Sequence, residues 1–258
     1  MSWTAVVLAG SRGTADPVAQ ARGVSHKAFA DIAGKPMIAH VLDTLSAAPS
    51  VDDVVVVIER SAPELPSLEL PSLGVRRLDA ARSPSLSALA GFEAAGAPVL
   101  VTTADHPLLT VEMVEYFLAA ATDLGVDVVA GVALRPVVEQ AGSTARRTYL
   151  RFSDGAISGC NMFALMTLES RAALTYWRLF EDKRKSPLKM AWSVGPFTLI
   201  RYVLGLLSTK AAAAALGRAA GCRAALVMLP FPDAAHDVDK PDDLAFAEAR
   251  LAARGAAG

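Results

Sequence analysis

The stretch Ala5-Val6-Val7-Leu8-Ala9-Gly10-Ser11-Arg12-Gly13-Thr14 decides the fold that this sequence predicts. Its first half is wholly apolar, which is typical of a buried strand. Its second half carries two glycines and an arginine. Glycines just past a parallel strand let backbone N–H groups approach a phosphate, and the arginine adds positive charge. The stretch therefore predicts a strand that opens into a phosphate-binding loop.

Four further short apolar runs follow along the chain, separated by segments with helical spacing. Alternation of this kind indicates an α/β, Rossmann-like fold, in which a mostly parallel central sheet has helices on both faces. The predicted strands are Ala5–Ala9, Val54–Ile58, Val99–Thr103, Asp127–Leu134 and Ala224–Leu229.

Three helices have recognisable beginnings. The apolar positions from Met37 to Leu45 share one helical face directly after Pro36. Thr110 is suited to cap a helix that has Glu112 in its first turn. The last helix begins at Pro241, and Gly255 is expected to end it.

Residues 167–220 break the alternation, because they contain helix formers and aromatic residues but no strand pattern. We interpret them as a helical insertion in a single domain that spans residues 1–258. A basic stretch from Lys183 to Lys189 leads into an apolar run that ends at Leu207. Residues 183–207 fit a peripheral membrane contact or a lid over an amphiphilic substrate. The more common role of such a segment is a homodimer interface or a core helix pair, and both alternatives stay open.

The composition excludes several classes of protein. With 258 residues and 53% hydrophobic content, the chain has ample material for a core. Its 25 basic and 26 acidic residues give a net charge of −1, so we expect no nucleic-acid partner. Cys160 and Cys222 form no closely spaced pair, and the N-terminus lacks a basic leader. A cytoplasmic location is therefore expected.

Two common phosphate-binding motifs are excluded at the first loop. The chain has no G-x-x-x-x-G-K-[ST], and G-x-G-x-x-G is not met because only Gly10 and Gly13 are present. A plain glycine-rich turn with solvated basic residues remains the alternative interpretation.

Three segments together resemble the N-terminal signature of the MobA-like NTP transferases: Val7–Thr14, Ser25–Ala28 and Ala33–Ile38. Two departures are Ser11, where a second glycine is usual, and Thr14-Ala15-Asp16 in place of an arginine. The resemblance implies a GT-A-like nucleotidyltransferase fold with Arg12 and Lys27 as catalytic cations. It also implies that the nucleotide is bound by Leu8, Ala9, Gly10, Ser11 and Gly13.

Two carboxylates are candidate metal ligands. Asp105 ends a predicted parallel strand, at the edge where open α/β sheets bind ligands, and its surroundings resemble the family's G-D-x-P. Asp239 matches the second aspartate of a D-[IV]-D-T-P pattern, with Asp237 as the reserve. The resemblance implies that Asp105 and Asp239 hold Mg²⁺, the expected cofactor. Otherwise these acids serve as turn formers and complement a helix N-terminus.

Two weaker matches concern the substrates. The run Arg82-Ser83-Pro84-Ser85-Leu86 resembles the R-x-x-S-[VL] that contacts the nucleotide in cytidylyltransferases, although a capped helix start explains Ser85 equally well. The run Ser158-Gly159-Cys160-Asn161-Met162-Phe163 resembles a segment that lines the acceptor pocket, so Asn161 is the acceptor-binding candidate. A turn into a strand is the alternative there.

The resemblance implies the transfer of a nucleoside monophosphate from an NTP, with CTP or GTP favoured, to a phosphorylated small molecule. The partners would be that NTP and the phosphorylated acceptor. If residues 183–207 form a lid, the acceptor would be amphiphilic. A sugar-nucleotide-dependent glycosyltransferase is a rival, but it needs D-x-D where this chain has Ala104-Asp105-His106-Pro107. A non-catalytic nucleotide-binding relative is a second rival, favoured by Ser11.

Overall fold

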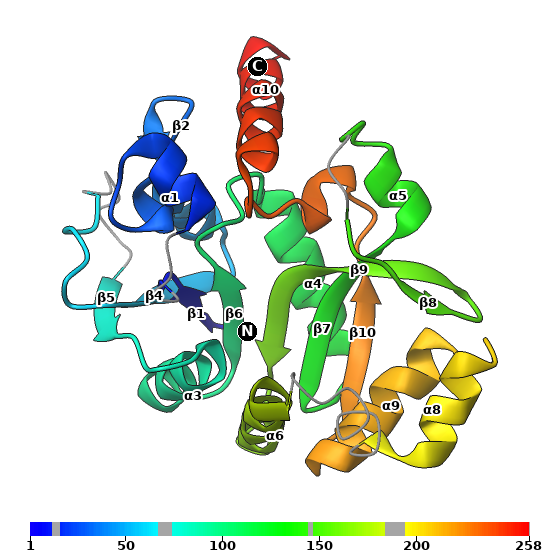
Figure 1. Cartoon of the computed structure of the whole chain (residues 1–258). Helices are drawn as coiled ribbons and strands as arrows, with labels where there is room; N and C mark the ends of the chain where they lie inside the picture. The colour runs from blue at the N-terminus through cyan, green and yellow to red at the C-terminus, as the bar shows by residue number, and fades with distance from the viewer. Residues whose placement is uncertain (12–15, 67–73, 144–146, 184–193, 258) are drawn as a thin grey trace.

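The computed structural model describes residues 1–11, 16–66, 74–143, 147–183 and 194–257. Its centre is an eight-stranded sheet with the order β10-β7-β9-β6-β1-β4-β5, and β8 pairs with β9 (Figure 1). The strands of this sheet run parallel except for β9, which is antiparallel to β6, β7 and β8. The strands are β1 (Trp3–Leu8), β4 (Val51–Ile58), β5 (Gly74–Asp79), β6 (Val99–Thr103), β7 (Val128–Leu134), β8 (Leu150–Phe152), β9 (Gly155–Leu165) and β10 (Ala224–Met228), with β2 (Asp31–Ile32) and β3 (Lys35–Pro36) in a separate pair.

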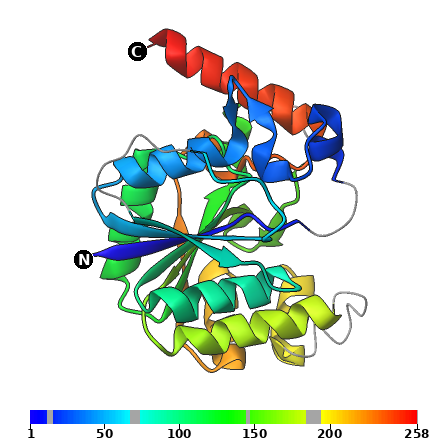
Figure 2. The same cartoon turned by 90° about the vertical axis from the view of Figure 1, so that its left-hand side faces the viewer.

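Helices cover both faces of the sheet, as Figure 2 shows from the side. Alternate residues of β1 point to opposite faces: Ala5 and Val7 belong to one buried cluster and Val6 to another. The first cluster includes residues of α2 and α4, and the second includes residues of α3 and α6. The helices are α1 (Pro17–Arg22), α2 (Met37–Ala47), α3 (Pro84–Ala95), α4 (Val111–Asp123), α5 (Arg135–Glu139), α6 (Ser170–Lys183), α8 (Pro196–Val203), α9 (Thr209–Ala220) and α10 (Pro241–Ala257), with the 3₁₀ turns η1 (Lys27–Phe29) and η2 (Pro232–Ala235).

The fold class expected from the sequence is confirmed, and all five predicted strands are present. The expected cap at Thr110 is present as well, since its hydroxyl accepts a hydrogen bond from the Met113 N–H. The helices α6, α8 and α9 confirm the helical character of residues 170–183, 196–203 and 209–220. Residues 184–193, which include most of the predicted basic stretch from Lys183 to Lys189, lie outside the described residues.

Among the differences from the prediction, three have a clear cause in the sequence. β5 was missed because it is half-exposed and carries charged residues, and β9 because glycine, serine and asparagine interrupt its apolar pattern. The expected helix end at Gly255 is wrong, because α10 runs through it to Ala257. A glycine in an exposed helix costs only about 1 kcal/mol, so it ends a helix only where the backbone turns left-handed.

The strand order places a topological switch at β1. The chain adds β4 and β5 on one side of β1 and then returns to place β6 on its other side. The loops that follow β1 and β6 therefore diverge at the carboxyl edge of the sheet. Open α/β sheets bind their ligands in such a crevice.

In the part of the chain that the structure describes, no helix is long and apolar enough to cross a membrane.

Asp127 ties the start of β7 to the start of β10. Its buried carboxylate accepts hydrogen bonds from the Arg223 backbone N–H at 2.7 Å, from the Arg223 guanidinium at 2.9 Å and from the Thr167 hydroxyl at 3.2 Å. These hydrogen bonds, those of Arg223 above all, lower the pKa of Asp127 to about 2.

Asp127→Asn is expected to lower the free energy of unfolding by about 1–2 kcal/mol at neutral pH, because a charge-assisted anchor is lost. The pKa of Asp127 in the folded state is depressed, so its contribution is present above the ordinary value of 3.8 and is lost as the pH falls toward about 2. Urea unfolding across this pH range should therefore show a shallower pH dependence in the variant. An equally steep dependence in both proteins would contradict the assignment.

Candidate active site

The loop that follows β1 is fixed by its two neighbouring strands. The Ala9 N–H donates to the Val57 carbonyl at 2.9 Å, and the Ala104 N–H donates to the Leu8 carbonyl at 3.0 Å. A Cβ on Gly10 would lie 3.3 Å from the Cβ of Ala80, so a glycine suits this close approach. Leu8, Ala9, Gly10 and Ser11 thus lie at the switch point. Arg12 and Gly13 lie outside the described residues, and their proposed roles stay predictions.

Lys27 lies at the edge of the sheet that is formed by the carboxyl ends of the parallel strands, between two carboxylates. It belongs to η1, and its Nζ donates to Asp105 Oδ2 at 2.6 Å and to Asp239 Oδ1 at 3.0 Å. Burial alone would lower the pKa of Lys27, but the two carboxylates outweigh burial and raise it. Lys27 is therefore a fixed positive charge at neutral pH. The structure thus brings together three residues that are far apart in the sequence and were each predicted for this site.

Asp105 is the more rigid of the two carboxylates. Thr103 Oγ1 donates to its Oδ1 at 2.5 Å, and the Val238 N–H donates to its backbone carbonyl at 2.8 Å. Burial favours the neutral acid, but the nearby Lys27 ammonium outweighs burial and lowers the pKa of Asp105. The bond from Val238 also fixes the neighbouring Asp239, whose side chain is 64% exposed. The site is therefore closed behind Asp105 and open toward solvent at Asp239.

Arg147, which no sequence motif indicated, braces the loop between η2 and α10. Its Nη1 donates to Asp237 Oδ1 and to the Ala235 carbonyl, both at 2.5 Å, and its Nη2 lies 3.5 Å from Asp243 Oδ1. The guanidinium is only 11% exposed. Because Arg147 holds Asp237, the carboxylate that faces Lys27 is Asp239. Nothing in the residues around Arg147 could have pointed to this role.

Asn161 lies beside this brace in an unusual backbone conformation. Its φ is +51°, in the left-handed region, and the pairing of β7 with β9 shifts register around it. Its Nδ2 donates to Asp237 Oδ2 at 3.3 Å. Asparagine tolerates the left-handed region better than most residues, and such outliers concentrate at functional sites. The structure thus brings Asn161 to the same edge, and its role in acceptor binding stays a prediction.

Comparison with known proteins decides the family. The MobA-like NTP transferase domain matches residues 5–161 of this chain. The chain belongs to the MobA-like NTP transferase family. It is by that membership a nucleotidyltransferase. No curated protein matches.

Solved structures agree with this family. A hypothetical transferase from Thermus thermophilus is 31% identical, with a TM-score of 0.79, and the match covers 95% of this chain and 100% of that one. A 2-C-methyl-D-erythritol 4-phosphate cytidylyltransferase, also from Thermus thermophilus, is 19% identical, with a TM-score of 0.56 and coverage of 98% and 100%. A CMP:2-keto-3-deoxy-manno-octonic acid synthetase complexed with CTP is 15% identical, with a TM-score of 0.56 and the same coverage. At this low sequence identity, the last two structures show a similarity of fold alone.

The carboxylates of this MobA-like transferase suit a magnesium ion. Asp105 and Asp239 are hard oxygen donors that already converge on one cation, the Lys27 ammonium. Among the described residues, no group of three or more histidine, cysteine or acidic side chains is arranged to hold a metal. Magnesium is commonly bound through one or two carboxylates together with substrate phosphates and water, so the donor set fits it.

Glu59 is a second acidic residue at the switch point, and the sequence motifs did not include it. It follows β4, and its Oε1 accepts a hydrogen bond from the Ser11 N–H at 2.6 Å. Its Oε2 lies 3.7 Å from His26 Nε2. A phosphate that approaches the Ser11 N–H must therefore displace Glu59. An acidic residue directly after a buried strand was the available signal, the same one that pointed to Asp105.

The structure accounts for Ser85 through packing between helices. Ser83, not Ser85, caps α3, since its hydroxyl accepts from the Leu86 N–H at 3.4 Å. The Ser85 N–H donates to Glu181 Oε1 at 3.1 Å, and its hydroxyl also donates to that carboxylate. Arg82 is exposed at the carboxyl end of β5. Nucleotide binding by Arg82 and Ser85 stays a prediction.

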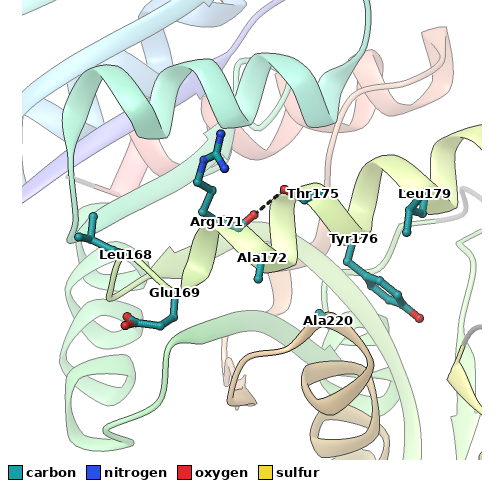
Figure 3. Close-up of a pocket in the computed structure, with 8 residues that line it drawn as sticks. All are labelled: Leu168, Glu169, Arg171, Ala172, Thr175, Tyr176, Leu179 and Ala220. Carbon is teal, nitrogen blue, oxygen red and sulfur yellow. Dashed lines mark hydrogen bonds between the residues drawn. The ribbon is translucent and has the colours of Figure 1, made fainter.

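A pocket of about 440 Å³ is lined by residues at and within α6 and by Ala220 at the end of α9 (Figure 3). The chain enters α6 from the end of β9, which runs antiparallel to β6. Leu168 and Glu169 therefore line the pocket at the edge of the sheet opposite Asp105. We do not assign this pocket to the transferase site.

Proposed function

We propose that this protein transfers a nucleoside monophosphate from CTP or GTP to a phosphate group of a small-molecule acceptor, with release of pyrophosphate and dependence on Mg²⁺. The observation that carries the proposal is the Lys27 ammonium held between Asp105 and Asp239 at the switch point. A cytoplasmic location belongs to the proposal and is supported by two unpaired cysteines, Cys160 and Cys222.

In the proposed reaction, a phosphate oxygen of the acceptor attacks the α-phosphorus of the NTP in line, and pyrophosphate leaves. A phosphate is already ionised at neutral pH, so the protein needs no general base. Its task is to position the two substrates and to neutralise the charge that develops on phosphate oxygens.

Lys27 performs the second task, because it stays protonated and is held in place by two hydrogen bonds. Arg12 is its proposed partner in the loop. Asp105 and Asp239 would hold Mg²⁺, which supplies further charge neutralisation at the phosphates when it is bound. Asn161 is the proposed contact to the acceptor, since it lies at the same edge of the sheet.

The test is pyrophosphate release from CTP, GTP, UTP and ATP against a panel of phosphorylated sugars, polyols and glycerol derivatives. We expect release to need one NTP and one acceptor, to stop on addition of EDTA and to recover with excess Mg²⁺. Release that persists in EDTA would contradict the metal assignment. Turnover of a sugar nucleotide instead of an NTP would favour the glycosyltransferase, and tight NTP binding without any release would favour the non-catalytic relative.

A further inference from the structure

The outward face of α8 is apolar. Phe197, Ile200, Val203 and Leu204 are 72%, 54%, 74% and 64% exposed, and Leu206 in the following turn is 60% exposed. The spacing of three to four residues places the first four on one side of the helix. Tyr202 lies on the inner side, where its ring packs edge-on against Phe152 at 5.6 Å. We call the five exposed residues the α8 patch.

A patch of this kind calls for a partner, because soluble proteins rarely leave neighbouring large apolar residues in water. The charges around it select the kind of partner. Residues 194–232, all of which the structure describes, contain no acidic residue and four basic ones: Arg201, Lys210, Arg218 and Arg223. Arg223 is paired with Asp127, and the Asp154 carboxylate accepts hydrogen bonds from Thr209, so among the described residues the unpaired positive charge comes from the first three. Lys210 and Arg218 are exposed on α9. The chain as a whole has a net charge of −1, so this region is an exception.

We propose that the α8 patch docks on an anionic lipid surface, with Phe197 and Ile200 inserted at the boundary between headgroups and acyl chains. A helix with an exposed apolar face that contains Arg201 and no acidic residue, followed by a helix with exposed Lys210 and Arg218, has the chemistry of an interfacial segment. Anionic headgroups attract lysine and arginine that lie near the surface.

A second copy of this chain fits the patch less well. A two-fold interface presents the same surface from both subunits, so the basic residues of α9 would face each other. Stable dimers also bury about 800 Å² on each partner, which is more than five side chains of one short helix supply. Figures 1 and 2 place α8 and α10 at opposite ends of the molecule, and Asp239 lies two residues before the start of α10. Docking through α8 would therefore leave the transferase site open to soluble substrates.

The test is flotation of the full chain with vesicles of phosphatidylcholine alone or of phosphatidylcholine mixed with phosphatidylglycerol. We expect recovery with the mixed vesicles only, and a decrease as salt is added. The double variant Phe197→Ser/Ile200→Ser should bind the mixed vesicles at least about tenfold more weakly than the unaltered protein. Leu124→Ser, which changes an apolar residue that is 44% exposed at the end of α4, is the matched control and should float like the unaltered protein.

A charge variant separates the contribution of electrostatic attraction from that of apolar insertion. Lys210→Glu/Arg218→Glu should weaken flotation and reduce its salt dependence. Thermal unfolding and pyrophosphate release of each variant in solution show that the fold is intact. Recovery of the unaltered protein in the soluble fraction with both kinds of vesicle would overturn the proposal. So would light scattering that shows a dimer which the α8 double variant abolishes.

Discussion

Lys27→Ala is expected to lower the rate of pyrophosphate release by about 10²–10³-fold, the loss that follows when one fixed electrostatic stabiliser is removed. Lys27 lies between two carboxylates, so its removal also leaves Asp105 and Asp239 facing each other without a cation. The variant should therefore bind Mg²⁺ at least as tightly as the unaltered protein while it reacts more slowly. Steady-state kinetics with the NTP and acceptor found in the panel would measure the first effect, and calorimetry with Mg²⁺ the second.

The matched control is Lys35→Ala. Lys35 is a nearby lysine in β3 that also pairs with an aspartate, Asp43, at 2.7 Å, but its side chain is 56% exposed. An exposed pair of this kind contributes less than about 1 kcal/mol, so this variant should keep its turnover. Equal losses in the two variants would show that Lys27 acts only through general charge. Unchanged turnover in Lys27→Ala would refute its catalytic assignment.

Asp105→Asn tests the cluster of Lys27, Asp105 and Asp239 by removing a negative charge instead of the positive one. The amide keeps the shape of the side chain but removes the negative charge that pairs with Lys27 and that would hold the metal. We expect a loss of about 10²–10³-fold and a higher Mg²⁺ concentration for half-maximal rate. A loss of rate with no change in the Mg²⁺ requirement would place the ion elsewhere.

The two carboxylates at the centre of the candidate site could be predicted because each lies at the end of a strand or just before the start of a helix. Asp105 ends a parallel strand, and Asp239 precedes the proline that begins the last helix, so pattern and topology both indicate the carboxyl edge. Lys27 came from the family resemblance alone. The structure adds the shared hydrogen bonds, which explain why these three residues belong together.

The residues that hold the site in place could not be predicted, because their contacts are distant in the sequence. Arg147 acts through a loop nearly ninety residues away, a separation that no local pattern encodes. β9 was missed because the residues that break its apolar pattern include Asn161, where the backbone turns left-handed. Departures from a regular pattern are expected where a site requires a special backbone. The family resemblance made Asn161 the acceptor-binding candidate, but the strand around it was not predicted.

Arg147→Met is the substitution expected to affect both stability and activity. It leaves the partly buried Asp237 carboxylate without its main partner and the Ala235 carbonyl without its donor. Breaking a buried ion pair by removing one partner is strongly destabilising, so we expect the free energy of unfolding to fall by about 3 kcal/mol. Turnover should fall as well, because the loop that carries Asp239 loses its brace. Urea unfolding and pyrophosphate release measure the two effects.

Two further variants separate positioning from charge. Arg147→Lys keeps the charge but not the planar fork that contacts both Asp237 and Ala235, so it should recover only part of the stability and of the rate. Arg171→Met removes an exposed arginine from its pair with Glu93 and should change the free energy of unfolding by less than about 1 kcal/mol. A positioning role also predicts that Arg147→Lys raises the Mg²⁺ concentration needed for half-maximal rate, since Asp239 is then less well placed. If Arg147→Met were less stable but kept both its turnover and its Mg²⁺ requirement, the arginine would serve the fold alone.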